Sequence, residues 1–222
     1  YRQAVKLNST YIDALTLDDG RVFVCTGELA ITLMANNFIT YFNKNIWEDF
    51  HGDEDLYQIV RDGNFSLDKF TSLCNIYRDL NSDGVADVED LYGNVLPFGT
   101  TQAYAWGAGS MIRYTSRDEE TGEYYFTFLN DHTSSFMEKM RAILFRNNIT
   151  YISGNNEMDT DEQLMAKIKA DTSLFTLAKM SCVEFLRDMD SDFGIVPLPK
   201  FDEAQANAAA IVKEAQAAAD KA

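Results

Sequence analysis

The sequence predicts a mixed α/β fold, and three observations support this class. Of the 222 residues, 46% are hydrophobic and 13% are aromatic, which is ample for a packed core. Short runs of β-branched and aromatic residues, such as 38–42, are typical of strands. Other segments repeat apolar residues every three or four positions, which is typical of one face of a helix.

The first part of the chain is predicted to contain two strands and a short helix. A turn at 18–20 precedes the first strand at 21–24, and the second strand covers 38–42. A helical turn is expected at 46–50. Trp47 in this turn is interpreted as a structural residue.

The next predicted helix begins at Ser66, whose hydroxyl suits the N-cap position. Apolar residues then recur on one helical face, at Leu67, Phe70, Cys74 and Tyr77. Because free cysteine on an apolar stripe is usually buried, Cys74 is interpreted as a core residue and not as a reactive thiol. We expect this helix to run directly into the polar segment that follows.

That segment, 79–90, reads DLNSDGVADVED and has the ligand spacing of an EF-hand-type calcium loop. Gly84 permits the sharp bend, and oxygen ligands fall in register at Asp79, Asn81, Asp83, Val85 (through its carbonyl), Asp87 and Asp90. No second loop of this kind occurs in the sequence, so it predicts one structural calcium and not a sensor switch. The alternative is a solvated turn without metal, because these side chains also hydrogen-bond the local backbone.

An aromatic and glycine-rich segment, 98–109, follows this loop. Beyond it, the two β-rich segments 110–115 and 123–129 are joined by a polar turn at 116–122. This order predicts a β-hairpin.

Two helices are predicted after the hairpin. The first is capped by Asp131 or Thr133, and its apolar side consists of Phe136, Met140, Ile143 and Leu144. The second, at 161–169, has a weaker pattern.

The last part of the chain contains apolar segments that are expected to be buried, followed by an alanine-rich segment. Residues 174–186 are apolar enough to pack, a turn is expected at 188–192, and 193–197 is predicted to be a buried strand closed by prolines. From Glu203 onward the composition shifts to alanine, which has the highest helix propensity and so predicts a helix.

Charge and cysteine content argue against several classes of function. With 19 Lys and Arg against 35 Asp and Glu, the formal charge is -16, which repels nucleic acid and anionic membranes. The three cysteines, Cys25, Cys74 and Cys182, are widely spaced and accompany only two histidines, which argues against zinc or thiol-redox chemistry. The sequence contains no run of 18 apolar residues, so no membrane span is predicted.

Several segments together resemble the extracellular solute-binding proteins of ABC importers, the family 1 type that includes maltose-binding proteins, in its clostridial branch. The resemblance covers roughly residues 10 to 205 and is carried by GRVF and TGE within 20–28, YFNK at 41–44, NFSLDKF at 64–70, the loop at 79–93 and FLRDMDSDFGIVPLPKFDEAQ at 185–205. The last block is the most specific of these.

This resemblance implies a periplasmic-binding-protein type II-like fold, in which two α/β lobes close on a ligand. It assigns 1–43 to a partial first lobe and the first crossing, and 44–173 to a complete second lobe that contains the calcium loop. Residues 174–205 become the return crossing and a first-lobe strand. The first lobe is expected to be truncated at both ends, and the alanine-rich helix at 206–222 does not resemble the family and is expected to be an artificial cap.

The resemblance also implies a non-catalytic role, in which a carbohydrate or similar small polar solute is held between lobes and delivered to an ABC permease. The expected ligand-binding residues are Glu28, Tyr41, Gln102, Tyr104, Trp106, Met180 and Ser181. Core packing is the alternative for Trp106, and simple solvation is the alternative for Glu28. The full-length protein is expected to be extracellular and lipid-anchored, and an incomplete first lobe would favour a homodimer.

Two other classes of function stay open at this point. One is a calcium-stabilised cell-surface interaction module, as dockerin-like loops are, although dockerins carry two such loops. The other is a glycoside hydrolase that uses a carboxylate pair such as Glu28 with Asp188 or Glu184.

Overall fold

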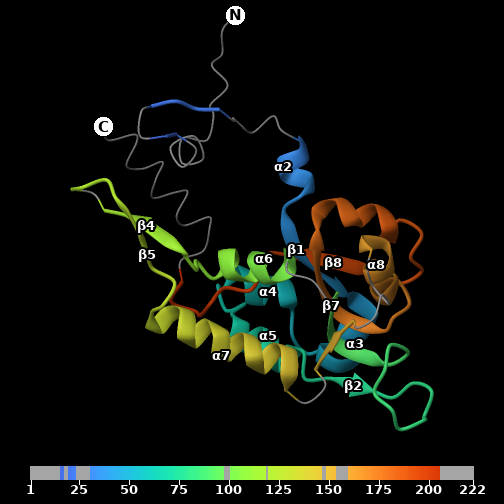
Figure 1. Cartoon of the computed structure of the whole chain (residues 1–222). Coiled ribbons are helices and arrows are strands. Elements are labelled where there is room, and N and C mark those ends of the chain that lie inside the picture. The colour runs from blue at the N-terminus through green and yellow to red at the C-terminus, as the bar shows by residue number, and fades with distance from the viewer. Residues whose placement is uncertain are drawn as a thin grey trace, which may run out of the picture.

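The computed structural model shows a mixed sheet with helices on both faces (Figure 1). It describes residues 16–17, 20–23, 31–97, 101–118, 120–146, 149–153 and 160–205. Glu28, Cys25 and the alanine-rich helix expected at 206–222 lie outside the described residues.

The main sheet has six strands in the order β2-β3-β7-β1-β8, with β6 paired to β3. The strands are β1 (Phe38–Asn43), β2 (Tyr77–Arg78), β3 (Leu91–Leu96), β6 (Thr150–Ile152), β7 (Ser173–Lys179) and β8 (Phe193–Val196). Strand β3 is parallel to β6 and β7, whereas β1 is antiparallel to β7 and β8. The carboxyl ends of β3, β6, β7 and β8 therefore lie at the same end of the sheet as the amino end of β1. This end of the strands is called the carboxyl edge below.

The central strands are buried on both faces, as strands between two layers of helices are. One core joins Phe42 and Phe175 of the sheet to α3 (Lys44–His51), α4 (Leu56–Arg61), α5 (Leu67–Leu73), α6 (Thr101–Gly109) and α7 (Asp131–Phe145). The core on the other face joins Tyr41 and Val95 to α8 (Asp161–Lys169) and to the 3-10 helix η1 (Met180–Leu186). The short helix α2 (Ile31–Ala35) leads into β1 and contacts η1.

The first predicted elements are largely confirmed. The strand at 38–42 is β1, the helical turn at 46–50 is part of α3, and Trp47 is buried with its indole N–H donating to the Glu54 carbonyl at 3.0 Å. The expected strand at 21–24 is different, because among the described residues Val22 forms only an isolated bridge with Thr16.

The helix capped by Ser66 is present, but its predicted extension into the polar loop is wrong. The Ser66 hydroxyl accepts a hydrogen bond from the Lys69 N–H, and the buried Cys74 is the C-cap of α5. The chain then turns, and Tyr77 pairs with Tyr92 of β3. Because Tyr77 pairs with β3, the helix ends before this residue although the helical spacing continues to it.

The hairpin and the helix after it are confirmed with shifted ends. Strand β4 (Thr115–Arg117) pairs with β5 (Tyr124–Phe126), so both strands are shorter than predicted. The N-cap of α7 is Asn130, not Asp131 or Thr133, because the Asn130 side chain accepts the Thr133 N–H at 2.8 Å.

The segments from α8 to β8 follow the predicted order. Helix α8 has the predicted bounds and begins with a capping box between Thr160 and Gln163. The apolar segment 174–186 divides into β7 and η1. The strand expected at 193–197 is β8, but it ends at Val196, and Phe193 and Ile195 are only partly buried. Because β1, β7 and β8 lie in one sheet with β3, the proposed lobe boundaries cut through this sheet and stay a prediction.

Within the part of the chain that the structure describes, no helix is long and apolar enough to cross a membrane.

Candidate functional site

The sheet edge where the parallel strands end is the best candidate for a solute site. Neighbouring strands β3 and β7 both finish there, but the chain leaves them toward opposite faces. After β3, Trp106 of α6 packs in one core, and after β7, Cys182 of η1 packs in the other. Connections that diverge in this way open a crevice at the carboxyl ends of the strands, which is where open α/β sheets bind ligands.

Five of the predicted ligand residues, Trp106 among them, lie on the two elements that follow these strands. Tyr104 on α6 is 61% exposed, and Met180 at the start of η1 is 37% exposed. Ser181 is also exposed, whereas Gln102 of α6 is buried at 8%. Figure 1 shows α6 and the start of β1 at this edge, and the Met180 N–H donates to the Asn37 carbonyl at 2.8 Å just before β1.

Tyr41 is placed in the core, although it was expected to contact a ligand. Its side chain has no exposed surface, and its hydroxyl lies 3.0 Å from the carbonyl oxygens of both Lys179 and Met180. Burial raises the pKa of this hydroxyl well above its ordinary value. In this structure Tyr41 therefore supports the junction of β7 and η1 from within and offers no face to a solute.

Trp106 is also buried, at 3% exposed, with its ring 5.2 Å from that of Phe70 in an edge-on contact. This placement matches the core-packing alternative. Its indole N–H has no hydrogen-bond partner among the described residues.

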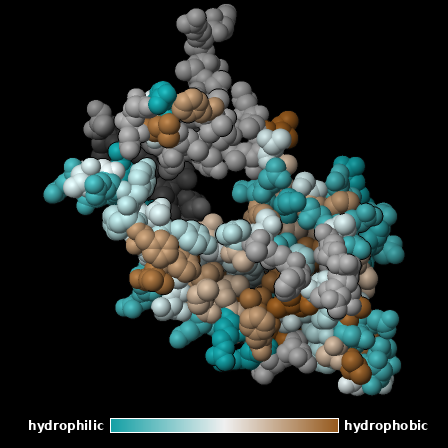
Figure 2. All heavy atoms as spheres, viewed as in Figure 1, coloured by the Kyte–Doolittle hydropathy of each residue, from teal (hydrophilic) through white to brown (hydrophobic). Residues whose placement is uncertain are grey.

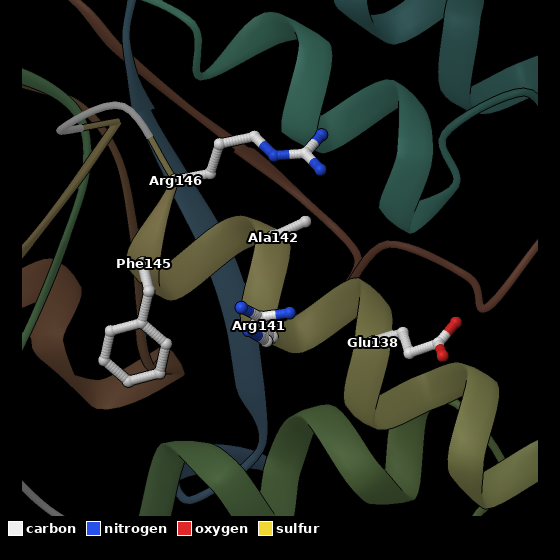
Figure 3. A pocket seen from close by; sticks show the side chains of 5 residues that line it. All are labelled: Glu138, Arg141, Ala142, Phe145 and Arg146. Carbon is white, nitrogen blue, oxygen red and sulfur yellow. The ribbon is translucent and has the colours of Figure 1, made fainter.

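A surface hollow of about 460 Å³ lies elsewhere, on α7. It is lined by Glu138, Arg141, Ala142, Phe145 and Arg146. Figure 3 shows these side chains leaving the helix in different directions without converging on a common point. None of the predicted ligand residues lines this hollow, and its arrangement defines no binding chemistry.

Apolar side chains are exposed where the β4–β5 hairpin joins α7 (Figure 2). The members of this group that are at least half exposed include Tyr114, Tyr124, Tyr125, Phe126, Leu129 and Met137. The rings of Tyr114 and Phe128 stack, with 5.0 Å between centroids. The hairpin thus keeps its aromatic side chains on the surface.

The loop at 79–90 closes on itself through side-chain to backbone hydrogen bonds. Asp79 Oδ2 accepts the Gly84 N–H at 2.9 Å, and Asp83 Oδ1 accepts the Val85 N–H at 2.7 Å. Gly84 has a φ of 76°, a left-handed conformation that glycine adopts without strain. Such turns occur in calcium loops and in metal-free loops alike, so they do not separate the two interpretations.

The donor types of this loop are those that calcium prefers, but the described side chains are not gathered around a common point. Hard cations prefer oxygen ligands, and the loop presents carboxylates, one amide and a backbone carbonyl at the required spacing. Among the described residues, no group of three or more His, Cys, Asp or Glu side chains is gathered closely enough to hold a metal ion. The carboxylates of the loop would therefore have to turn inward on binding.

Asp90, at the last loop position, has a different environment from the other predicted ligands. It is fully buried, and its Oδ2 accepts the Tyr77 hydroxyl at 2.7 Å and the Asp87 N–H at 3.3 Å. Its Oδ1 accepts the Leu80 N–H at 3.1 Å. The hydrogen bond from Tyr77 is the largest cause that lowers the pKa of Asp90, and the same bond raises the pKa of Tyr77 to about 12.

Lys167 reaches the same end of the loop from α8. It is only 8% exposed, and its ammonium donates to the carbonyl of Val88 and, at 3.2 Å, to that of Asp90. Burial lowers the pKa of Lys167, and the nearby carboxylates oppose this shift. Sequence reasoning missed both Tyr77 and Lys167; the available signal was a lysine between Leu164 and Ile168 on an otherwise apolar stripe.

The loop and the candidate solute site lie at opposite edges of the sheet. Strand β3 begins at Leu91, directly after the loop, and reaches the carboxyl edge five residues later at Leu96. At about 3.3 Å per residue, the two ends of this strand are about 17 Å apart. The loop therefore has no direct contact with a solute bound at the carboxyl edge.

No protein-family model and no curated protein matches this chain. Solved structures do match its fold. An ABC substrate-binding protein, Lmo0181 from Listeria monocytogenes in complex with cycloalternan, aligns with a TM-score of 0.57 at 12% identity over 90% of this chain. UspC of M. tuberculosis gives 0.57 at 12% identity over 91%, and a cyclo/maltodextrin-binding protein complexed with maltotetraose gives 0.52 at 13% identity over 91%.

These alignments cover 45%, 50% and 45% of the three solved chains, so this chain spans about half of their length. At such low identity the similarity concerns the fold. The described residues have the mixed α/β fold of periplasmic-binding-protein type II-like proteins, which confirms the predicted fold class.

Proposed function

We propose that this chain is part of the substrate-binding component of an ABC importer, with a site for a carbohydrate or similar small polar solute. The observation that carries the proposal is the divergence of the chain after β3 and β7, in a fold shared with proteins solved with bound oligosaccharides. The solute would lie at the carboxyl edge of the sheet.

In this proposal, the exposed residues at that edge form one wall of the cleft. Tyr104 offers an aromatic face to the apolar face of a sugar ring, and Ser181 offers a hydroxyl to sugar hydroxyls. Met180 supplies an adaptable apolar contact. Further wall residues, among them Glu28, and delivery to a permease by lobe closure are part of the same proposal.

A paired substitution tests this wall. Tyr104→Ala should weaken binding of maltotetraose about tenfold in calorimetric titration, because the stacking face is lost. Tyr124→Ala is the matched control, since Tyr124 on the hairpin is 65% exposed against 61% for Tyr104. Equal effects of the two changes, or none from Tyr104→Ala in a chain that binds the sugar, would contradict the assignment.

Two features favour binding over glycoside hydrolysis. Two of the solved structures reported above are binding proteins by their names. Asp188 pairs with Lys169 at 2.6 Å, and this contact lowers its pKa, whereas a general acid of a glycosidase needs a raised pKa. Incubation with oligosaccharides should return them unchanged.

We also propose that the loop at 79–90 binds one structural calcium through Asp79, Asn81, Asp83, the Val85 carbonyl, Asp87 and Asp90. Support comes from the donor set and its spacing along the loop. The ion would connect β2 to β3 at the edge of the sheet opposite the solute.

Extracellular location, attachment through a lipid anchor and membership of the clostridial branch are part of the same proposal. Association into a homodimer is proposed as well, with the exposed group around the β4–β5 hairpin as one surface that such contact could cover. Light scattering after gel filtration tests the homodimer.

A further inference from the structure

We infer that Tyr77 and Lys167 are positioning residues that hold Asp90, and with it the end of the loop at 79–90, in place before any metal binds. The inference rests on the proposed calcium site for its functional meaning. The contacts that carry it concern only side chains and backbone groups of this chain.

A buried carboxylate needs several partners, because removing its charge from water is costly. Asp90 has no exposed surface, and three groups donate to it: the Tyr77 hydroxyl and the N–H groups of Leu80 and Asp87. Two of these donors belong to the loop itself. The carboxylate thus ties the beginning of the loop to its end.

Two donors to this end of the loop, Tyr77 and Lys167, come from elements outside the loop. Tyr77 lies in β2, where it pairs with Tyr92, and their rings are 5.4 Å apart. Lys167 lies in α8, whose neighbouring residues Leu164 and Ile168 are fully packed in the core. The end of the loop is therefore fastened both to the sheet and to a helix.

The ammonium of Lys167 compensates the charge at this end, and among the described residues it forms no ion pair with a side chain. It donates to the carbonyls of Val88 and Asp90, so two of its three N–H groups are used on the loop backbone. Its charge also faces the carboxylates of Asp87, Glu89 and Asp90. This end of an acidic loop is thus partly neutralised by the protein itself.

The donors leave Asp90 a limited capacity for a metal. A carboxylate has about four lone-pair sites. Oδ2 already accepts two hydrogen bonds and Oδ1 accepts one, so one site remains, on Oδ1. Asp90 held in this way contributes one oxygen to calcium, whereas a glutamate at this position contributes two.

The test uses Tyr77→Phe and Lys167→Met, each of which removes the donor and keeps the apolar part of the side chain. Tyr57→Phe is the matched control for the first, since both tyrosines are 37% exposed and the Tyr57 ring contacts Phe42 at 5.6 Å. Lys169→Met is the control for the second, on the same helix and paired with Asp188.

The first readout is hydrogen exchange of the 79–90 amides in chelator. We expect faster exchange at Leu80 and Asp87 in both variants and in neither control. The second readout is the calcium dissociation constant from titration with the ion alone, which should rise about tenfold, as for other groups that orient metal ligands.

Unchanged exchange in chelator would overturn the inference whatever the chain does with calcium. An unchanged calcium constant, with the ion bound, would also overturn it, because a merely structural role lowers stability equally with and without the ion. If the unaltered chain binds no calcium while exchange still accelerates in both variants, the proposed metal site fails and the positioning role stands.

Discussion

Cys74 and Cys182 are both buried thiols, and burial raises the pKa of Cys74 above its ordinary value and that of Cys182 to about 11. Because the thiolate is the reactive form, we expect neither thiol to react with a disulfide reagent at about pH 8 while the protein is folded. Labelling is measured in a Cys25→Ser background, before and after guanidinium is added. Rapid labelling of either cysteine without denaturant would contradict the described packing.

At the scale of single residues, the sequence predicts burial better than it predicts contact. Cys74 was assigned to the core from its position on an apolar stripe, and it is buried. Tyr41 was assigned to a ligand, but its hydroxyl bonds two carbonyls that lie 138 and 139 positions later in the chain. Lys167 donates to a carbonyl 77 positions away, and no local pattern reports such a contact.

The turn of the β4–β5 hairpin is held by Asp118, whose carboxylate accepts the Thr121 N–H at 2.7 Å, the Thr121 hydroxyl and the Glu120 N–H. These bonds lower the pKa of Asp118. A group with a lowered folded pKa stabilises the fold above its unfolded pKa, about 3.9, and loses that contribution as the pH falls through the folded pKa.

We therefore expect the Asp118 carboxyl to titrate below the ordinary aspartate range in NMR, with the Thr121 amide losing protection at the same pH. Asp118→Asn should remove this pH dependence. Titration of Asp118 in the ordinary range would show that the turn does not hold the carboxylate.

Helix α8 depends on its first turn, where Thr160 and Gln163 form a capping box. Thr160→Ala should lower the free energy of unfolding by about 1 kcal/mol, because one N–H of the first turn loses its partner. The midpoint of urea unfolding measures this loss. Thr160→Ser keeps the hydroxyl and should behave like the unaltered chain; equal destabilisation by both changes would speak against the cap.

At the scale of elements, local chemistry predicts where a helix starts more reliably than where it ends. The N-cap at Ser66 was predicted, and the cap of α7 was missed by one residue, because Asn130 precedes two other residues that suit the same position. The end of α5 was predicted too late. Tyr77 continues the helical spacing, but its pairing with Tyr92 across the sheet takes precedence.

Calcium should act on the stability of the whole molecule if the loop at 79–90 binds it. An ion that binds only the folded state raises the free energy of unfolding by about 2.7 kcal/mol at a hundred times its dissociation constant. Thermal unfolding in calcium and in chelator measures this, with magnesium as the control ion. Identical melting temperatures in calcium and in chelator would rule out a stabilising ion.

The architecture of the whole molecule was predicted from a resemblance and from the alternation of strands and helices. The strand order could not be predicted from the residues, because the pairing of β3 with β7 joins segments about 80 positions apart. That pairing also defines the candidate site, because it makes β3 and β7 neighbours, and the elements that follow them pack on opposite faces of the sheet. Only this pairing places the ends of the two strands that precede α6, with Tyr104, and η1, with Met180, next to each other.

The central claim is that a small polar solute binds at the carboxyl edge of the sheet. The most direct test is NMR titration of the isotope-labelled chain with maltotetraose. We expect amide shifts that centre on α6 around Tyr104 and on the start of η1 at Met180 and Ser181. Shifts confined to the hollow on α7 around Arg141, or no shifts at millimolar sugar, would contradict it.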